Sequence, residues 1–234
     1  MSSFRMCFAA CCPALGFAHF TTMEPILAPV LYNLGLNAVE VGFFFSIFPV
    51  AYIGTSFAQQ YFSPKVEKRV RLIFAFAMNA VAFIMVGPSL ILRLPVNLWL
   101  MGVGQFIGGA MMSMILQPTL IELIDTGEKY YPQHKESGAI TNMSSGIFNC
   151  SQCFGNLVAP LYGTSVSDII GFRLTMDILV AIDIAFVIAY FLLAGGVEAF
   201  GNTWNNLRNG EKVGKEIEKD DQKPEVIGEN AQIN

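Results

Sequence analysis

Long apolar stretches separated by short polar segments dominate this chain. A membrane-spanning helix needs about 20 mostly apolar residues, and six stretches reach that length. Their bounds are Phe4–Leu31, Val41–Tyr61, Leu72–Ile91, Leu98–Ile124, Gly138–Gly163 and Phe172–Leu193. The pattern predicts an all-α, polytopic membrane protein with six transmembrane helices, which together form one domain over residues 1–196.

The pattern changes after residue 196. Val197, Phe200, Trp204 and Leu207 recur at helical spacing among polar residues, which predicts a helix over 197–209 that lies on the membrane surface. Residues 210–234 have no apolar periodicity and are rich in Lys, Glu, Asp, Gln and Gly, a composition typical of a disordered tail.

Composition agrees with the membrane class. Hydrophobic residues make up 53% of the chain and charged residues 14%, whereas an average soluble protein has about 25% charged residues. The chain has no basic stripe with interleaved aromatic residues, so nucleic-acid binding is not expected. The lipid bilayer is therefore the first expected partner.

The positive charges predict the orientation of the helices. With six spans, both chain termini lie on one side of the membrane, and that side collects all but two of the 14 Lys and Arg residues. The two exceptions are Arg93 and Arg173. Because the cytosolic side carries the excess of Lys and Arg, both termini are expected to be cytosolic.

Glu24 is the most informative residue of the first apolar stretch. A carboxylate within a membrane-length segment is costly in hydrocarbon and is expected to face a bundle interior or an aqueous cavity. The alternative is a carboxylate that reaches the membrane surface. Pro25 and Pro29 remove backbone hydrogen bonds nearby, as in the discontinuous helices of transporters.

Two later helices also carry polar residues. The fifth stretch contains Asn142, Ser145, Asn149, Gln152 and Asn156, which face either a seam between helices or a water-filled path, because such polarity is costly against lipid. Asp183 lies in the middle of the sixth stretch and is the second candidate for a buried acid. Asp177 lies nearer the non-cytosolic end, where it can reach water.

Enzymatic chemistry has little support in the sequence. No zinc-protease, nucleophile-elbow, phosphate-loop or dinucleotide-binding motif is present, so an enzyme is not expected. An intramembrane hydrolase that uses Glu24 and Asp183 is a distant alternative. With only His19 and His134 as histidines, no metal site or cofactor is expected. His19 is either a polar residue in a helix seam or part of a proton relay.

Several short motifs, in this order and spacing, resemble the C-terminal half of a major facilitator superfamily transporter. The likeness covers about residues 10–195 and is greatest to the vesicular amine and polyamine transporter-like branch of proton-coupled antiporters. The motifs are Glu24-Pro25-Ile26-Leu27, Asn33-Leu34-Gly35-Leu36, Gly87-Pro88, Gln117-Pro118-Thr119-Leu120, Ala159-Pro160 and Gly171-Phe172-Arg173.

The resemblance implies roles for individual residues. Glu24 would bind a proton or a cationic substrate in a central cavity. Asp183 matches an acidic position of the last helix, while Ser113 and Asn149 occupy positions that are acidic in monoamine-transporting members. The expected substrate- and proton-binding residues are therefore Glu24, Asp183, Asn149, Gln152 and Ser113. The resemblance also implies a location in a vesicle or another endomembrane.

The chain corresponds to one half of such a transporter, because the superfamily fold has two six-helix halves with the substrate site between them. It is therefore either a truncated product, a half-size transporter that dimerises, or a subunit without transport activity. The expected function is a secondary active transporter, or its C-terminal half, that exchanges protons for a small organic cation. Its expected partners are a complementary six-helix half or a second copy, with a non-transporting structural subunit of a membrane complex as the alternative.

Overall fold

The computed structural model describes residues 2–62, 66–133 and 138–193, together with 196, 199–201 and 203–204. All regular structure in these residues is helical. The six helices are α1 (Ser2–Asn33), α2 (Ala38–Phe62), α3 (Lys68–Val86), α4 (Leu98–Tyr130), α5 (Ala139–Ile170) and α6 (Phe172–Leu193).

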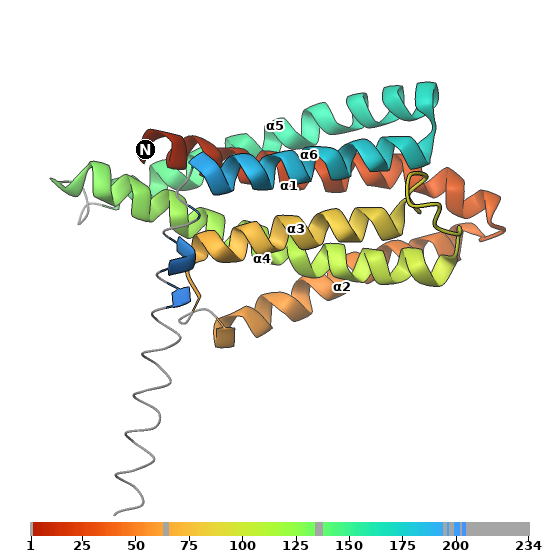
Figure 1. The fold of residues 1–234 in the computed structure, drawn as a ribbon, viewed down its shortest axis with the longest axis horizontal. Helices are drawn as coiled ribbons and strands as arrows, with labels where there is room; N and C mark the ends of the chain where they lie inside the picture. Colours follow the sequence, from red (N-terminus) through yellow and green to blue (C-terminus); the bar gives the residue numbers. More distant parts are fainter. Residues whose placement is uncertain are drawn as a thin grey trace, which may run out of the picture.

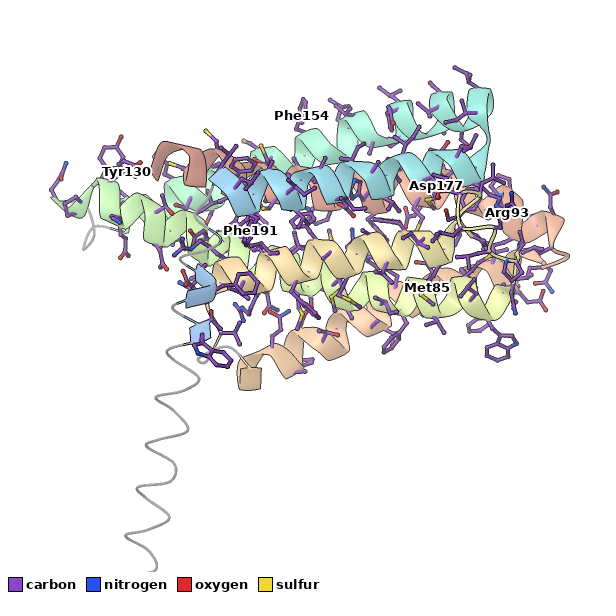
Figure 2. All side chains as sticks on the ribbon, viewed as in Figure 1. Met85, Arg93, Tyr130, Phe154, Asp177 and Phe191 are labelled. Atoms are coloured by element: carbon purple, nitrogen blue, oxygen red, sulfur yellow. The ribbon has the colours of Figure 1, made fainter. Side chains whose placement is uncertain are left out.

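Successive helices run in alternate directions along one bundle, so α1 begins and α6 ends at the same end (Figure 1). α4 packs between α2 and α3, α6 packs against α3, and α1 contacts both α4 and α5. Tyr130 and Arg93 mark the two opposite ends of the bundle (Figure 2). Lys68 at the start of α3 pairs with Asp125 of α4 at the Tyr130 end.

Five of the six helices are long and apolar enough to cross a membrane. These segments are Met6–Asn33, Ala38–Gln59, Lys68–Val86, Leu98–Tyr130 and Phe172–Leu193. α5 has the length, but its many Asn, Ser and Thr residues make it less apolar than the others. The membrane class predicted from the sequence is thus confirmed, with five candidate spans among the described residues.

Several predicted helix boundaries are wrong. The third helix ends at Val86 rather than Ile91, because Gly87-Pro88 begins a turn. α4 continues past Ile124 to Tyr130. α5 continues past Gly163 to Ile170, so only Gly171 separates it from α6. The positive φ of 86° at Gly171 lets the chain reverse.

α1 is continuous, although a break was expected at Pro25 and Pro29. Pro13 also lies within this helix. Both Pro25 and Pro29 are exposed, so their rings point away from the packed interior, and each removes only one backbone hydrogen bond. The comparison with the discontinuous helices of transporters therefore does not hold for this helix.

Side chains at the helix ends explain where two of the helices begin. Before α2, Asn37 Oδ1 accepts hydrogen bonds from the backbone N–H groups of Val39 and Glu40, and Glu40 Oε2 accepts one from the Asn37 N–H. This reciprocal pair is a capping box. Before α4, Asn97 Oδ1 accepts a hydrogen bond from the Trp99 N–H.

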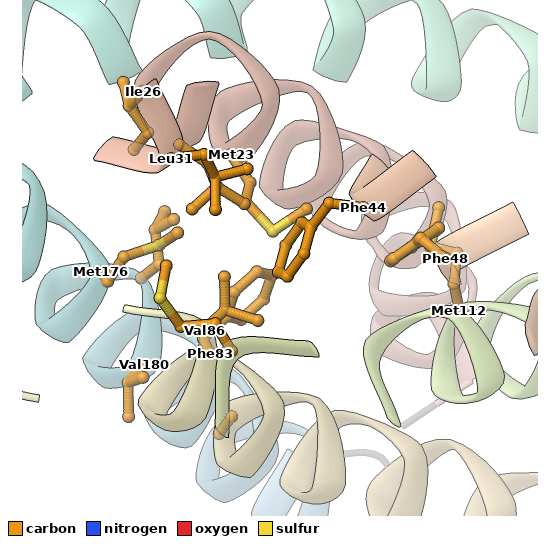
Figure 3. Close-up of a cluster of buried hydrophobic side chains, with 14 of the residues drawn as sticks. Met23, Ile26, Leu31, Phe44, Phe48, Phe83, Val86, Met112, Met176 and Val180 are labelled. Carbon is orange, nitrogen blue, oxygen red and sulfur yellow. The ribbon is translucent and has the colours of Figure 1, made fainter. Parts of the chain in front are cut away.

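The core is built by every helix except α5. One buried apolar cluster combines residues of α1, α2, α3, α4 and α6, including Met23, Phe44, Phe83, Met112 and Met176 (Figure 3). A second cluster lies around Phe76 and Ile115. Neither cluster has a fully buried residue from α5, so α5 lies at the periphery and packs chiefly on α1.

The C-terminal predictions fall largely outside the described residues. Residues 199–201 and 203–204 are helical, and the Thr203 hydroxyl oxygen accepts a hydrogen bond from the Glu67 N–H at the start of α3. The rest of the predicted surface helix over 197–209, and the whole predicted tail over 210–234, lie outside the described part of the chain.

Candidate functional site

Glu24 lies on the outer surface of the bundle. It is exposed, as is Pro25, and it therefore does not face the interior formed by the six helices of this chain. It precedes the end of α1, Asn33, by nine residues, a distance of about 13 Å along the helix axis. At that depth a Glu side chain is too short to reach the end of the helix, so the position is costly against lipid.

Small residues bring α1 and α5 close together on one side of Glu24. A Cβ atom on Gly155 would lie 2.2 Å from the Ala14 carbonyl oxygen, and one on Gly163 would lie 2.4 Å from Thr22 Cγ2. The Thr22 hydroxyl donates to the Ala159 carbonyl oxygen at 3.1 Å. These contacts align α1 and α5 in parallel, in the small-residue packing common between membrane helices.

The seam continues outward into a polar stripe on α5. Asn142, Ser145, Asn149, Gln152 and Asn156 follow each other at alternate spacings of three and four residues, which places them along one face. Asn142 and Asn149 are exposed, and the other three are partly exposed. Thr21 Oγ1 donates to Asn156 Oδ1 at 2.8 Å, which joins the stripe to α1 one turn before Glu24.

An aromatic pocket lies on the other side of Glu24. It has a volume of about 290 Å³, and its lining includes Phe17 and Phe20 of α1 with Phe48 and Tyr52 of α2. The Phe20 and Phe48 rings stack with their centroids 4.5 Å apart. Phe17 and Phe20 precede Glu24 by two turns and one turn, so all three lie on the same side of α1.

These features form one continuous surface, which we call the α1–α5 face. Its members are Phe17, Phe20, Thr21 and Glu24 of α1 with Asn149, Gln152 and Asn156 of α5. Glu24 lies at the end of the face nearer Asn33, the aromatic rings lie toward α2, and the amides of Gln152 and Asn149 lie about two to four turns nearer the start of α1. The structure thus places three predicted site residues, Glu24, Asn149 and Gln152, on one face.

The other two predicted site residues lie inside the bundle. Asp183 is 0% exposed, and its Oδ2 accepts a hydrogen bond from Asn79 Nδ2 at 2.9 Å. Its Oδ1 lies 3.1 Å from His19 Nδ1, and His19 is 2% exposed. The group of three residues from α1, α3 and α6 is therefore fully enclosed.

Ser113 is buried between α2 and α4. Its hydroxyl oxygen accepts a hydrogen bond from Gln59 Nε2 at 2.8 Å and donates to the Ala110 carbonyl oxygen at 3.0 Å. Gln59 is also buried. Ser113 therefore joins two helices of this chain and does not belong to the α1–α5 face.

Two site features were missed by the sequence analysis. The aromatic pocket had a signal in α1, where Phe17, Phe20 and Glu24 recur at spacings of three and four residues. The partners of Asp183 had no comparable signal, because His19, Asn79 and Asp183 lie on three different helices. Their pairing depends on how these helices pack.

No protein-family model, no curated protein and no solved structure matches the chain. Within the described residues, no group of three or more His, Cys, Asp or Glu side chains is arranged to hold a metal ion. A functional proposal therefore rests on the residues themselves and their geometry.

Proposed function

We propose that this chain is one six-helix half of a secondary active transporter, and that the α1–α5 face is its share of the substrate site. The exposed carboxylate of Glu24 within a membrane-length helix is the observation that carries the proposal. A carboxylate at this depth requires shelter from lipid, and the part of the chain that the structure describes provides none. A second membrane unit that faces α1 and α5 would provide it.

The chemistry of the face favours a small organic cation as the solute. Glu24 offers a negative charge, and the rings of Phe17, Phe20 and Phe48 lie one to two turns away around a pocket. Aromatic faces attract organic ammonium groups, most strongly where water is excluded. The amide of Asn156, which Thr21 joins to α1 one turn before Glu24, adds a hydrogen-bond donor for the polar part of a solute. Asn149 and Gln152 lie on the same face farther toward the start of α1.

Exchange follows from the competition of two cations for Glu24. In a dry cavity a carboxylate is favoured in its neutral, protonated form, whereas a bound organic cation favours the ionised form. Proton and solute would therefore bind alternately. If the two halves expose the site first to one side of the membrane and then to the other, the proton gradient drives the solute.

In this proposal, α5 is the sixth helix that crosses the membrane. Its composition is less apolar than that of the other helices, but it lies parallel to α1 along the seam at Gly155 and Gly163. Its polar stripe belongs to the α1–α5 face, so the covering unit would shield it from lipid as well. The partner is a complementary six-helix half or a second copy of the chain, both termini are cytosolic, and an endomembrane is the location.

Replacement of Glu24 by Gln tests the proposal. The assay uses acid-loaded vesicles from cells that express the whole assembly, with radiolabelled tetraethylammonium as the solute. In the wild type, we expect an outward-moving proton to drive uptake of the cation. Because E24Q cannot ionise, we expect it to lose at least nine-tenths of this uptake while it is expressed at the normal level.

Asp168→Asn provides the matched control, since Asp168 is an exposed acid in the last turn of α5. D168N should keep normal uptake. Proton-driven uptake that is unchanged in E24Q would contradict the assignment of Glu24.

The same experiment addresses a structural subunit as the second candidate function. The α1–α5 face could pack against a partner that carries no solute, because amides also form hydrogen bonds between membrane helices. In that case the wild type would show no uptake of the cation, yet it would co-purify with a membrane partner, and replacement of Asn149 and Gln152 by Leu would release that partner.

A further inference from the structure

His19, Asn79 and Asp183 meet at mid-depth in the bundle. Asp183 lies halfway along α6, and His19 lies near the middle of the Met6–Asn33 span of α1. All three side chains are at most 5% exposed. The carboxylate of Asp183 accepts a hydrogen bond from Asn79 at one oxygen, and His19 Nδ1 lies 3.1 Å from the other. The His19 ring also packs edge-to-face with Phe83 at 5.2 Å.

Few other charges lie near this group. Within two helical turns of His19, Asn79 or Asp183 along their own helices, the only other charged residues among those described are Glu24 on α1 and Asp177 on α6. Glu24 is exposed on the outer face, and Asp177 Oδ2 accepts a hydrogen bond from the Leu90 N–H toward the end of the bundle. Neither residue supplies a positive charge that would balance Asp183.

The remaining titratable residues of the neighbouring helices are more distant or neutral. Cys12 of α1 and Tyr190 of α6 each lie two turns away, and α5 carries Cys153 and Tyr162 at about this depth. On α3, the nearest charge is Arg71, eight residues before Asn79. On α4 it is Glu122, about four turns from the level at which Gly108 meets Ala82.

The charge balance of the group depends on one proton. With a neutral imidazole and an ionised carboxylate, the interior would hold a net charge of −1, which is costly in a low-dielectric environment. One additional proton makes the group neutral. Asn79 donates to one oxygen of Asp183, which favours the ionised carboxylate, and His19 Nδ1 lies within ion-pair distance of the other oxygen, so the proton belongs on His19.

We propose that His19 and Asp183 form a proton-binding site in the centre of the bundle, with Asn79 as the residue that positions the carboxylate. The ligand is a single proton, held as an imidazolium–carboxylate pair that links α1 to α6. The site differs from Glu24 in residue, depth and burial, and it does not depend on whether the chain transports a solute.

The geometry also determines how the proton leaves. His19 Nε2 is buried and has no hydrogen-bond partner among the described residues, so no acceptor is in place for its proton while the bundle is closed. Release therefore requires α1 to separate from α6 or water to enter between them. Such an opening would couple the loss of the proton to a movement of α1.

Nitrogen-15 NMR of histidine tests the charge of His19 in the folded chain. The chain has two histidines, so His134→Gln leaves His19 as the sole labelled residue. We expect an imidazolium signal in detergent micelles at about pH 8, where an ordinary histidine, which titrates near 6.5, is neutral. In the same background, Asp183→Asn should convert this signal to that of a neutral imidazole.

Gln59→Leu is the matched control, because it removes another buried hydrogen bond between two helices without touching the site. It should leave the imidazolium signal in place. A neutral imidazole at about pH 8 in the H134Q protein would overturn the proposal, as would an imidazolium that persists in D183N. Because the measurement needs no partner and no solute, its failure is distinct from a failure of the transporter proposal.

Discussion

Arg173 shows how a single side chain can hold a whole turn in place. Its Nε donates to the Pro88 carbonyl oxygen at 2.6 Å, and its Nη2 donates to those of Ser89 and Leu94 at 3.2 and 2.9 Å. One turn later, Asp177 accepts from the Leu90 N–H. Asp177, which was expected to reach water near this end of the helix, is partly exposed and also fixes the same turn.

Replacement of Arg173 by Met should loosen the turn between α3 and α4. Three partly buried backbone carbonyls would lose a charged donor, so we expect the free energy of unfolding to fall by about 2 kcal/mol. Hydrogen exchange should also become faster for the backbone amides of residues 89–94. Both quantities can be measured in detergent micelles.

Arg93→Gln is the control for this change. Arg93 is an exposed arginine within the same turn, so R93Q should alter neither stability nor exchange appreciably. If R173M and R93Q had equal effects, the hydrogen bonds of Arg173 would not be what holds the turn.

For single residues, the sequence identified the acids within membrane-length helices, but it did not identify what they contact. Glu24 and Asp183 are both acidic residues within membrane-length helices, and either could have been the buried one. The structure buries Asp183 and exposes Glu24. That difference depends on how α1 rotates against its neighbours, and a pattern within one helix does not contain it.

At the scale of helices, the seam between α1 and α5 depends on the absence of side chains. Gly155 lies against the backbone of Ala14, which cannot move aside as a flexible side chain could. Gly146 lies on the same helix, is exposed, and would have open space around an added Cβ atom. The two glycines therefore separate the effect of packing from that of helix propensity.

Replacement of Gly155 by Ala should destabilise the chain, whereas replacement of Gly146 by Ala should not. We expect G155A to lower the free energy of unfolding by about 1–3 kcal/mol, the usual cost of overpacking. G146A should raise it by up to about 1 kcal/mol, because Ala is the better helix former. Unfolding by SDS in mixed micelles, followed by circular dichroism, measures both. Equal shifts in the two variants would show that α1 and α5 are not in close contact at Gly155.

Helix positions were largely predictable, because runs of apolar residues are long and turn residues separate them. The end of α3 was misplaced because the residues after Gly87-Pro88 are still apolar, although the chain has already turned. α1 was expected to break at its prolines, but exposed rings leave the helix continuous. The parallel pairing of α1 with α5 involves distant parts of the sequence and became visible only in the structure.

At the scale of the whole molecule, the number of membrane crossings depends on α5. If α5 crosses the membrane, the segment before it and the segment after it lie on opposite sides. If α5 lies on the surface instead, both segments share one side. The Tyr130 end of the bundle would then no longer correspond to a single side of the membrane (Figure 2).

Labelling of introduced cysteines decides between these arrangements. Gln133→Cys and Asp168→Cys place exposed thiols before and after most of α5, in a chain whose own five cysteines are replaced by Ala. In cells whose plasma membrane alone is permeabilised, a membrane-impermeant maleimide should react with Q133C on the cytosolic side and not with D168C on the lumenal side. Detergent that opens every membrane should allow both reactions. Labelling of both positions before that detergent is added would mean that α5 does not cross the membrane.

The parallel pairing of α1 with α5 has a consequence for the order of synthesis. α1 ends at Asn33, whereas α5 begins at Ala139, so the ribosome needs roughly 5–20 seconds to make the intervening chain. During that interval the first helix waits in or beside the insertion machinery, and the surface of Ala14 and Thr22 that later packs on α5 has no partner. We expect a chaperone or the translocon itself to retain this helix until the later ones emerge, and a nascent chain stalled before Ala139 should crosslink to that machinery through α1.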